Sequence, residues 1–290
     1  MTPSISAVIV TYNARQDLDR CLESLAKQND VALEVIVYDN ASSDGTAQMV
    51  AERYPWVRLM ASSANAGLTK GVNQAIGVAH GEYICLLDSD TVIEPGCMRI
   101  LKKFMDGHAN AGVVAARMLN VDGSIQETAR NFPRVSNALL GRQTLLARWF
   151  PNNPITLGYL RRSDLKRTDP FEVDWVAAAC MMFRRDLVAR IGHLDEDFFV
   201  YWVDADWCKR VRNAGLSVWC VPQARVFHIE QNRIGKKKSP RGIRSFHEGA
   251  YLFYRKHYVK SSWHPMAQLA RIGLGTRCRL MLLTNSWMKR

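Results

Sequence analysis

The stretch YICLLDSDTVIEPG, residues 83–96, places two carboxylates directly after an apolar run. The run from Tyr83 to Leu87 is typical of a short buried strand. In an extended chain Asp88 and Asp90 project to the same side, where two negative charges repel each other unless a cation lies between them. Carboxylates at this spacing suit Mg²⁺ or Mn²⁺, held together with the phosphates of a substrate. The alternative is that Asp90 caps a helix that follows.

The sequence around this stretch alternates between strand and helix patterns. Strands are expected at 6–10, 34–39, 57–60 and 83–87, and helices at 17–27, 46–53 and 64–81. This alternation predicts an α/β fold with a mostly parallel central sheet flanked by helices on both faces. In such sheets ligands bind beyond the carboxyl ends of the strands, which is where the acids after the second and fourth strands fall.

The later part of the chain has a weaker pattern followed by a second ordered block. Residues 118–168 carry turn signals, prolines and scattered charge, and we interpret them as a loop-rich region that faces a substrate. Order returns in residues 172–228, where the pattern predicts an apolar run, a short helix, and a longer helix from Asp204 to Gly215. Two short strands are then expected at 217–221 and 225–227.

Four D-x-D pairs occur in the chain, and their contexts separate them. The pair at 17 and 19 falls in an exposed helix, and the pair at 195 and 197 in a loop, so neither indicates a site. Asp204 opens a predicted helix, whose dipole favours the ionised carboxylate, and can serve as a general base or as an ordinary N-cap. Asp39 can accept a hydrogen bond from a uracil or thymine ring or from a ribose hydroxyl, or it can form a turn. His228 ends a short strand, and a lone histidine is more often structural.

The composition indicates a globular protein with a large core. The 290 residues are 48% hydrophobic, which suits one large domain or two small ones. No run approaches the roughly 18 apolar residues of a membrane span, and no secretory leader is expected. The seven cysteines form no C-x-x-C pair, so we expect buried thiols in a reducing cytosol. The motifs of serine hydrolases, P-loop proteins and Rossmann dehydrogenases are missing from the sequence.

The net charge of +12 comes from the C-terminal part of the chain. Residues 233–290 carry 14 Lys and Arg and one acid, Glu248, so the other 25 basic and 26 acidic residues leave residues 1–232 at −1. A basic tail binds phosphates, in nucleic acid, at a membrane surface or in a lipid diphosphate, or it is only a solvated surface. A nucleic-acid binder would need basic and aromatic residues interleaved on the domain itself, so we predict no nucleic-acid partner.

Four segments carry a family resemblance. SAVIVTYNARQDLDRCLESL, EVIVYDNASSDGT, NAGLTKGVNQAIGVAHGEYICLLDSDTVIEPG and the 172–228 block resemble, in order and spacing, the inverting glycosyltransferases of family 2, which have the GT-A fold. The sequence looks closest to the branch that adds rhamnose or similar sugars in bacterial surface polysaccharide synthesis. The resemblance implies transfer from a nucleotide-sugar donor, dTDP-rhamnose or a UDP-sugar, to a hydroxyl of a glycan or lipid-linked acceptor.

The resemblance also implies a domain organisation. Residues 1–232 would form the GT-A glycosyltransferase domain, with a nucleotide-sugar half at 1–117 and an acceptor half at 118–232. Residues 233–290 would be a basic amphipathic extension. Its mixture of basic and apolar residues suits helices that lie on an anionic bilayer, which would make the protein cytoplasmic and peripheral on the inner membrane. Alternatively, these helices pack on the domain or form the contact of a homodimer.

Particular residues acquire expected roles from the resemblance. Mg²⁺ or Mn²⁺ would be held by Asp90 with Asp88 and His228. Asp204 would deprotonate the acceptor hydroxyl, and Trp175 and Trp202 would shape the acceptor pocket. Contacts to the nucleotide would come from Thr11, Tyr12, Asn13, Asp39, Asn65, Gly67, Asn73 and Asp88.

Two positions depart from the family pattern. Val203 stands where members carry the first of two acids before the last helix, so the base role falls to Asp204. The family's small segment rich in glycine is AAAC here, at 177–180, which would narrow the acceptor site. The loss of one acid leaves a non-catalytic nucleotide or glycan binder as the alternative.

Overall fold

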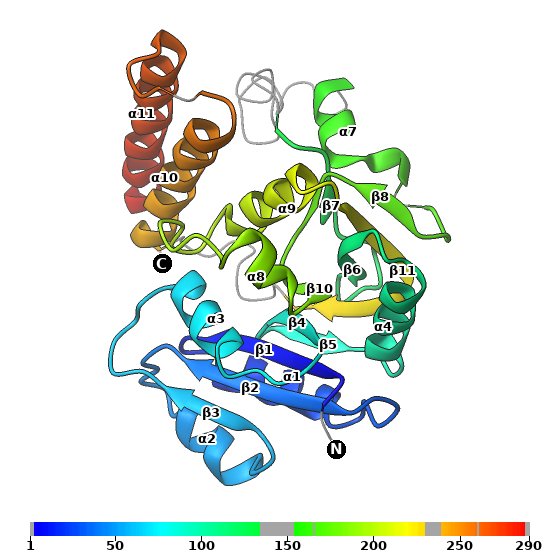
Figure 1. Cartoon of the computed structure of the whole chain (residues 1–290). Helices are drawn as coiled ribbons and strands as arrows, with labels where there is room; N and C mark the ends of the chain where they lie inside the picture. The colour runs from blue at the N-terminus through cyan, green and yellow to red at the C-terminus, as the bar shows by residue number, and fades with distance from the viewer. Residues whose placement is uncertain (1–2, 134–153, 165, 230–238, 260, 288–290) are drawn as a thin grey trace.

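The computed structural model describes residues 3–133, 154–164, 166–229, 239–259 and 261–287 (Figure 1). Part of the predicted loop-rich region, residues 134–153, and the first part of the basic tail, residues 233–238, lie outside the described residues. The seven cysteines all lie within them as free thiols, and six are buried, as predicted. Among the helices of these ranges, none combines the length and the apolar character that a membrane span needs.

A central sheet organises the described chain (Figure 1). Four neighbouring strands at one side are parallel, β6 and β11 are parallel to each other, and β10 runs antiparallel between the two groups. The predicted mostly parallel sheet is thus confirmed. A separate pair joins β7 (Ala129–Arg130) to β9 (Trp175–Val176). In spatial order the main sheet contains β3 (Arg58–Ala61), β2 (Leu33–Asp39), β1 (Ile5–Thr11), β4 (Tyr83–Asp88), β10 (Cys180–Arg184), β6 (Ala111–Leu119), β11 (Ser217–His228) and β5 (Thr91–Ile93), with β8 (Phe171–Val173) on β11.

Helices cover both faces of this sheet because the strand residues alternate between two cores. On β4, Tyr83, Cys85 and Leu87 enter one core, and Ile84 and Leu86 enter the other. Each such side chain contributes about 1.5–3 kcal/mol on full burial. The first core includes α1 (Arg15–Leu25), α2 (Thr46–Arg53) and α4 (Cys97–Gly107), and the second includes α3 (Leu68–Ile76), α8 (Leu187–Ile191) and α9 (Val203–Asn213).

Two expectations about local structure are wrong. The two strands predicted at 217–221 and 225–227 are one strand, β11, with a register shift between Val221 and Arg225. Pro222 cannot donate to the ladder, so the pattern indicated a break where the strand continues through an irregularity. Asp90 caps no helix, because β5 follows it directly and α4 begins only at Cys97, after Gly96 in the left-handed region.

The strand order places a ligand-binding edge where the sequence predicts one. From β1 the chain continues outward through β2 and β3, and then returns to the other side of β1 as β4. The carboxyl ends of β1 and β4 therefore diverge at a topological switch point, the usual ligand site of such sheets. The register pairs Thr11 with Asp39 and Val10 with Asp88, so the predicted polar residues end their strands side by side.

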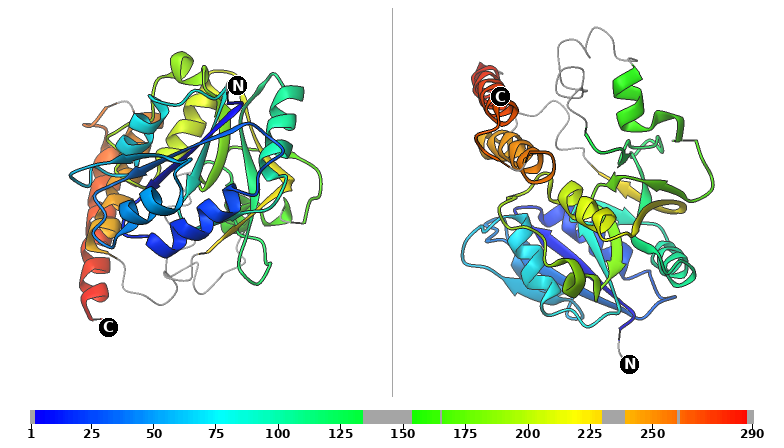
Figure 2. Two further views of the ribbon diagram at one scale, coloured as in Figure 1. Left: turned by 90° about the horizontal axis from the view of Figure 1, so that it is seen from below. Right: turned by 45° about the horizontal axis from the view of Figure 1, so that its top comes forward.

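The C-terminal tail forms two helices along one flank of the molecule. In Figures 1 and 2, α10 (Pro240–His257) and α11 (Pro265–Trp287) lie side by side, and α10 also contacts α9. The remaining described helices are α7 (Pro154–Leu160) and the short 3₁₀ turn η1 (Arg162–Asp164). Three placements were expected for the tail: on a bilayer, packed on the domain, or in a homodimer contact. The structure shows α10 packed on the domain.

A buried carboxylate on α9 attaches α10 to the domain. Asp206 is fully buried, and its Oδ2 accepts a hydrogen bond from Arg210 Nε at 2.9 Å. Its Oδ1 lies 2.8 Å from both His257 Nε2 and Lys256 Nζ on α10. Burial opposes the ionisation of this carboxyl, but His257 and Lys256 outweigh it and hold the pKa of Asp206 below its usual range.

Replacing Asp206 by Asn should lower the free energy of unfolding by about 3 kcal/mol. The shape is kept, but one oxygen becomes an NH₂ group that faces basic donors on either side. Denaturant unfolding measures the change. Asp195→Asn is the matched control, because Asp195 Oδ2 contacts the same Lys256 Nζ at 2.5 Å from a partly exposed position, and it should cost less than about 1 kcal/mol. Equal losses for the two variants would contradict this role of Asp206.

Candidate active site

An open cleft of about 1780 Å³ lies at the carboxyl edge of the sheet. Site residues that were predicted in three different parts of the chain line this cleft together. The most distant of them, Thr11 and His228, are 217 positions apart in the sequence. Two predicted nucleotide contacts, Asp39 and Asn73, are not among the lining residues. The predicted residues that do line the cleft are Thr11, Tyr12, Asn13, Asn65, Gly67, Asp88, Asp90, Trp175, Trp202, Asp204 and His228.

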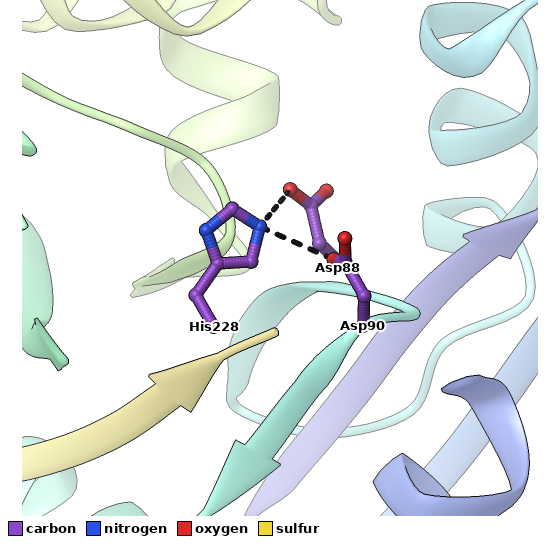
Figure 3. Close-up of side chains that lie close together, drawn as sticks. All are labelled: Asp88, Asp90 and His228. Carbon is purple, nitrogen blue, oxygen red and sulfur yellow. Dashed lines mark ion pairs between the residues drawn. The ribbon is translucent and has the colours of Figure 1, made fainter. Parts of the chain in front are cut away.

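Two carboxylates and one imidazole converge at one point of the cleft (Figure 3). The antiparallel pairing of β11 with β5 sets His228 opposite Thr91, next to Asp90. His228 Nε2 lies 3.2 Å from Asp90 Oδ1 and 3.7 Å from Asp88 Oδ2. One donor atom from each of the three residues falls within 4.8 Å of the other two, which is compact enough to surround a single cation.

Gln126 fixes how the imidazole faces the two carboxylates. Its Nε2 donates to the carbonyl oxygen of His228 at 3.1 Å and to Asn120 Oδ1 at 2.8 Å. Gln126 Oε1 is thereby turned toward His228 Nδ1, at 3.0 Å, and accepts the proton of that nitrogen. In its neutral form the ring then presents the lone pair of Nε2 to Asp88 and Asp90. Three electron-pair donors aimed at one point, with a supporting hydrogen bond behind the histidine, fit a divalent metal ion.

Asp204 lies in the first turn of α9 and lines the same cleft. Its Oδ1 accepts a hydrogen bond from the Ala205 N–H at 2.9 Å, and Trp202 before it takes a left-handed backbone, φ 74°. Burial raises the pKa of Asp204, while the Ala205 hydrogen bond and the charge of Arg130 oppose that rise. A carboxylate with a raised pKa is a stronger base than an ordinary one.

The raised pKa predicts the acidic limb of the pH profile. The base role expected for Asp204 from the resemblance requires the ionised carboxylate. With that role, kcat/KM should fall as pH drops through a pKa above about 3.9, the ordinary value for Asp. Arg130→Gln removes a nearby positive charge, so it should move this limb to higher pH. Arg130→Lys keeps the charge and is the control. The profile is measured from pH 4 to 9. If the acidic limb of kcat/KM stays at the same pH in Arg130→Gln, the charge of Arg130 does not affect the ionisation of Asp204.

Polar atoms at the ends of β1 and β2 are buried in an arrangement that suits a nucleotide. Thr11 Oγ1 and Asp39 Oδ1 have no hydrogen-bond partner within the described residues, although both are buried and their residues are paired in register. Asp39 Oδ2 accepts from the Ser42 N–H at 3.1 Å, so the turn considered for this acid also forms. A buried polar atom without a partner is costly. Thr11 lines the cleft, so a polar group of a bound ligand would offset this cost there, whereas Asp39 is not among the lining residues.

Of the nucleotide contacts predicted at Asn65, Gly67 and Asn73, the first two line the cleft and Asn73 does not. Asn40 holds the loop at the cleft, because its Nδ2 donates to Gly67 O at 3.0 Å and its Oδ1 accepts from the Ala66 N–H at 2.8 Å. Asn73 lies outside the cleft, with its side chain bonded to both backbone groups of Leu194 at 2.9 and 3.1 Å. Its contacts are those of a residue that positions the loop before α9.

The side of the cleft that was expected to bind the acceptor is aromatic. Trp175 Nε1 donates to Asn131 O at 2.9 Å, and Arg130 stacks on its ring at 4.9 Å. Trp202 Nε1 donates to Phe246 O on α10 at 3.0 Å, and its ring contacts Phe246. The sequence reasoning missed Arg130 and Gln126, both in the stretch interpreted as variable loops, and it missed the α10 wall. No local pattern marks these residues, because their partners are distant in the sequence.

The fold and the site define an α/β enzyme of the GT-A class, and comparisons with known proteins give its family. Residues 6–192 match the family model described as Glycosyl transferase family 2, and the chain belongs to this family of glycosyltransferases. It is 30% identical to the N-acetylglucosaminyl-diphospho-decaprenol L-rhamnosyltransferase of Mycobacterium tuberculosis, over 98% of this chain and 95% of that one.

Two further similarities agree with this assignment. The dTDP-rhamnosyl transferase RfbF of Shigella flexneri is 26% identical, over 89% of this chain and 82% of its own. The mannosyltransferase PcManGT from Pyrobaculum calidifontis, solved in complex with GDP-Man and Mn²⁺, superimposes with a TM-score of 0.59. It is 18% identical over 99% of this chain and 74% of that one, so this likeness concerns the fold.

Proposed function

We propose that this glycosyltransferase moves a sugar, with inversion, from a nucleotide diphosphate donor to a hydroxyl of a glycan or lipid-linked acceptor. Rhamnose from dTDP-rhamnose is the first candidate, because the near full-length relatives are named for that sugar. The observation that carries the proposal is the common cleft, which both Asp204 and the cluster of Asp88, Asp90 and His228 line. A donor diphosphate at the cluster leaves its sugar between the two.

Each part of the cleft has a separate task in this proposal. Mg²⁺ or Mn²⁺, when bound by Asp88, Asp90 and His228, would supply Lewis-acid stabilisation of charge on the leaving diphosphate. Thr11 Oγ1 and Asp39 Oδ1 would take hydrogen bonds from the base or ribose, since both atoms are buried and lack a partner within the described residues. Asp204 would accept the proton of the acceptor hydroxyl as that oxygen attacks the anomeric carbon.

The tail would bring the protein to an anionic membrane surface. Four apolar residues of α11 are 58–65% exposed, and their spacings of three, eight and three residues keep them on one side of the helix. We name this set the exposed stripe: Leu269, Ile272, Leu280 and Leu283. Residues 233–290 supply the positive charge that anionic lipid attracts, about 1 kcal/mol for each basic residue near the surface.

A donor panel tests the proposed reaction. The protein is incubated with Mn²⁺, membrane extract and, in turn, dTDP-rhamnose, several UDP-sugars and GDP-mannose, and released nucleoside diphosphate is measured. We expect release with one donor, dependent on the extract. If a donor binds but no donor releases its nucleoside diphosphate, the protein is better explained as a non-catalytic binder, the alternative suggested by Val203 in place of an acid.

Flotation with phosphatidylglycerol vesicles tests the membrane contact of the tail. A stable dimer in solution without vesicle binding would assign the exposed stripe to a homodimer.

A further inference from the structure

The cleft that contains Asp204 continues between the two tail helices. Part of its wall is made by apolar side chains of both helices, which we name the tail groove: Phe246, Phe253 and Tyr254 of α10 and Met266, Leu269 and Leu274 of α11. Figures 1 and 2 show these helices side by side along one flank. A molecule whose hydroxyl lies at Asp204 therefore has an apolar surface available in the same space.

The tail groove reaches the outer surface of the protein. Met266 and Leu269 line the cleft, yet they are 40% and 62% exposed. Leu269 also belongs to the exposed stripe, so the lining of the cleft and the outer apolar side of α11 share this residue. A free sugar gains little from such a wall, whereas each CH₂ group buried there contributes about 0.8 kcal/mol. The shape and chemistry suit an amphiphile.

The polar groups of the tail that line the cleft are complementary to an anion. Arg241 and Arg277 both contribute to the lining, and the described α10 and α11 residues that line it include no acid. Arg241 lies over the Phe199 ring at 3.9 Å, and Arg277 is partly buried in the wall of α11. Guanidinium groups bind phosphate oxygens in pairs and tolerate apolar neighbours better than ammonium groups do.

We propose that the tail groove binds the apolar chain of a lipid acceptor, and that Arg241 and Arg277 bind the phosphates that join this chain to the acceptor sugar. This inference rests on the proposed function, and it names the acceptor as a linear lipid phosphate or diphosphate. In this arrangement α10 and α11 are part of the acceptor site in addition to being a contact to the membrane.

Farnesyl diphosphate is a probe with the required chemistry and no sugar. Its affinity for the full chain is measured by calorimetry in EDTA, so that no divalent ion holds the diphosphate at Asp88 and Asp90. It should bind at least about tenfold more tightly than either inorganic pyrophosphate or farnesol. Pyrophosphate lacks the apolar chain for the tail groove, and farnesol lacks the phosphates for Arg241 and Arg277. Short-chain phosphatidylglycerol is the comparison for a bilayer lipid and should bind at least about tenfold more weakly.

Variants on α11 locate the binding surface. Leu269→Asp and Arg277→Gln should each weaken farnesyl diphosphate binding by about tenfold. Leu280→Asp is the matched control: it is 58% exposed on the same helix, does not line the cleft, and should leave the affinity within about twofold. Since Leu269 and Leu280 are both exposed, both variants should fold, which circular dichroism checks.

Three results would overturn the inference: equal affinity for farnesyl diphosphate and pyrophosphate, equal binding of phosphatidylglycerol, or equal effects of Leu269→Asp and Leu280→Asp. The donor panel keeps this test separate from the proposed function. Sugar transfer without farnesyl diphosphate binding would reject the tail groove and keep the reaction. Binding without transfer from any donor would reject the reaction and keep the lipid phosphate as the ligand of the groove.

Discussion

Asp204→Asn should lower turnover by at least ~10²-fold while the fold persists, because the amide keeps the shape but cannot accept a proton. The Ala205 N–H can still donate to the side-chain oxygen, so the first turn of α9 keeps its hydrogen bond. The loss should appear in kcat more than in KM, since the base acts on the acceptor proton during transfer. Release of nucleoside diphosphate with the productive donor is the measurement.

Asp197→Asn is the control for this substitution. Asp197 belongs to another D-x-D pair and is exposed in the loop before α9, so turnover should stay close to that of the unmodified protein. Circular dichroism and donor binding show whether Asp204→Asn is folded. Unchanged turnover in that folded variant would show that Asp204 is not the base. Because Val203 replaces the other acid that family members carry before this helix, neither of the two family positions would then supply one.

Local chemistry in the sequence predicts β1 to β4, the acids that end β2 and β4, and the pair Asp88 and Asp90. The alternation of apolar residues and turn formers predicts α2 with the bounds it has, Thr46–Arg53, because helix propensity and capping act over a few residues. Asp88 and Asp90 stand out because two acids follow directly after the apolar residues of a buried strand. Both features depend on neighbours in the chain, and one sequence is enough to recognise them.

Pairings between distant residues could not be predicted in this way. Gln126 orients His228 across 102 positions, and His257 meets Asp206 across 51. Nothing in the sequence tells which of the 14 basic tail residues face solvent and which neutralise a buried acid. The structure assigns Lys256 and His257 to Asp206, so part of the charge that suggested a membrane surface holds α10 on the domain.

Asp90→Ala should also lower turnover by at least ~10²-fold, because the cluster that suits a divalent ion loses the carboxylate nearer to His228. A readout independent of catalysis is thermal unfolding with and without Mn²⁺. An ion that binds only the folded chain stabilises it by about 2.7 kcal/mol at 100 times its Kd. The unmodified protein should gain this stability, Asp90→Ala should not, and Gln126→Ala should fall between them because His228 stays but loses its orientation.

The control for this variant is Asp122→Asn. Asp122 is an exposed turn residue four positions before Gln126. Its Oδ1 accepts hydrogen bonds from Ser124 Oγ at 2.6 Å and from the Ser124 N–H at 2.9 Å. This variant should keep the full Mn²⁺ response and full turnover. If Asp90→Ala gained as much stability from Mn²⁺ as the unmodified protein, the ion would bind elsewhere. The convergence of Asp88, Asp90 and His228 would then be an ion pair between a protonated imidazole and two acids, without a part in holding the donor.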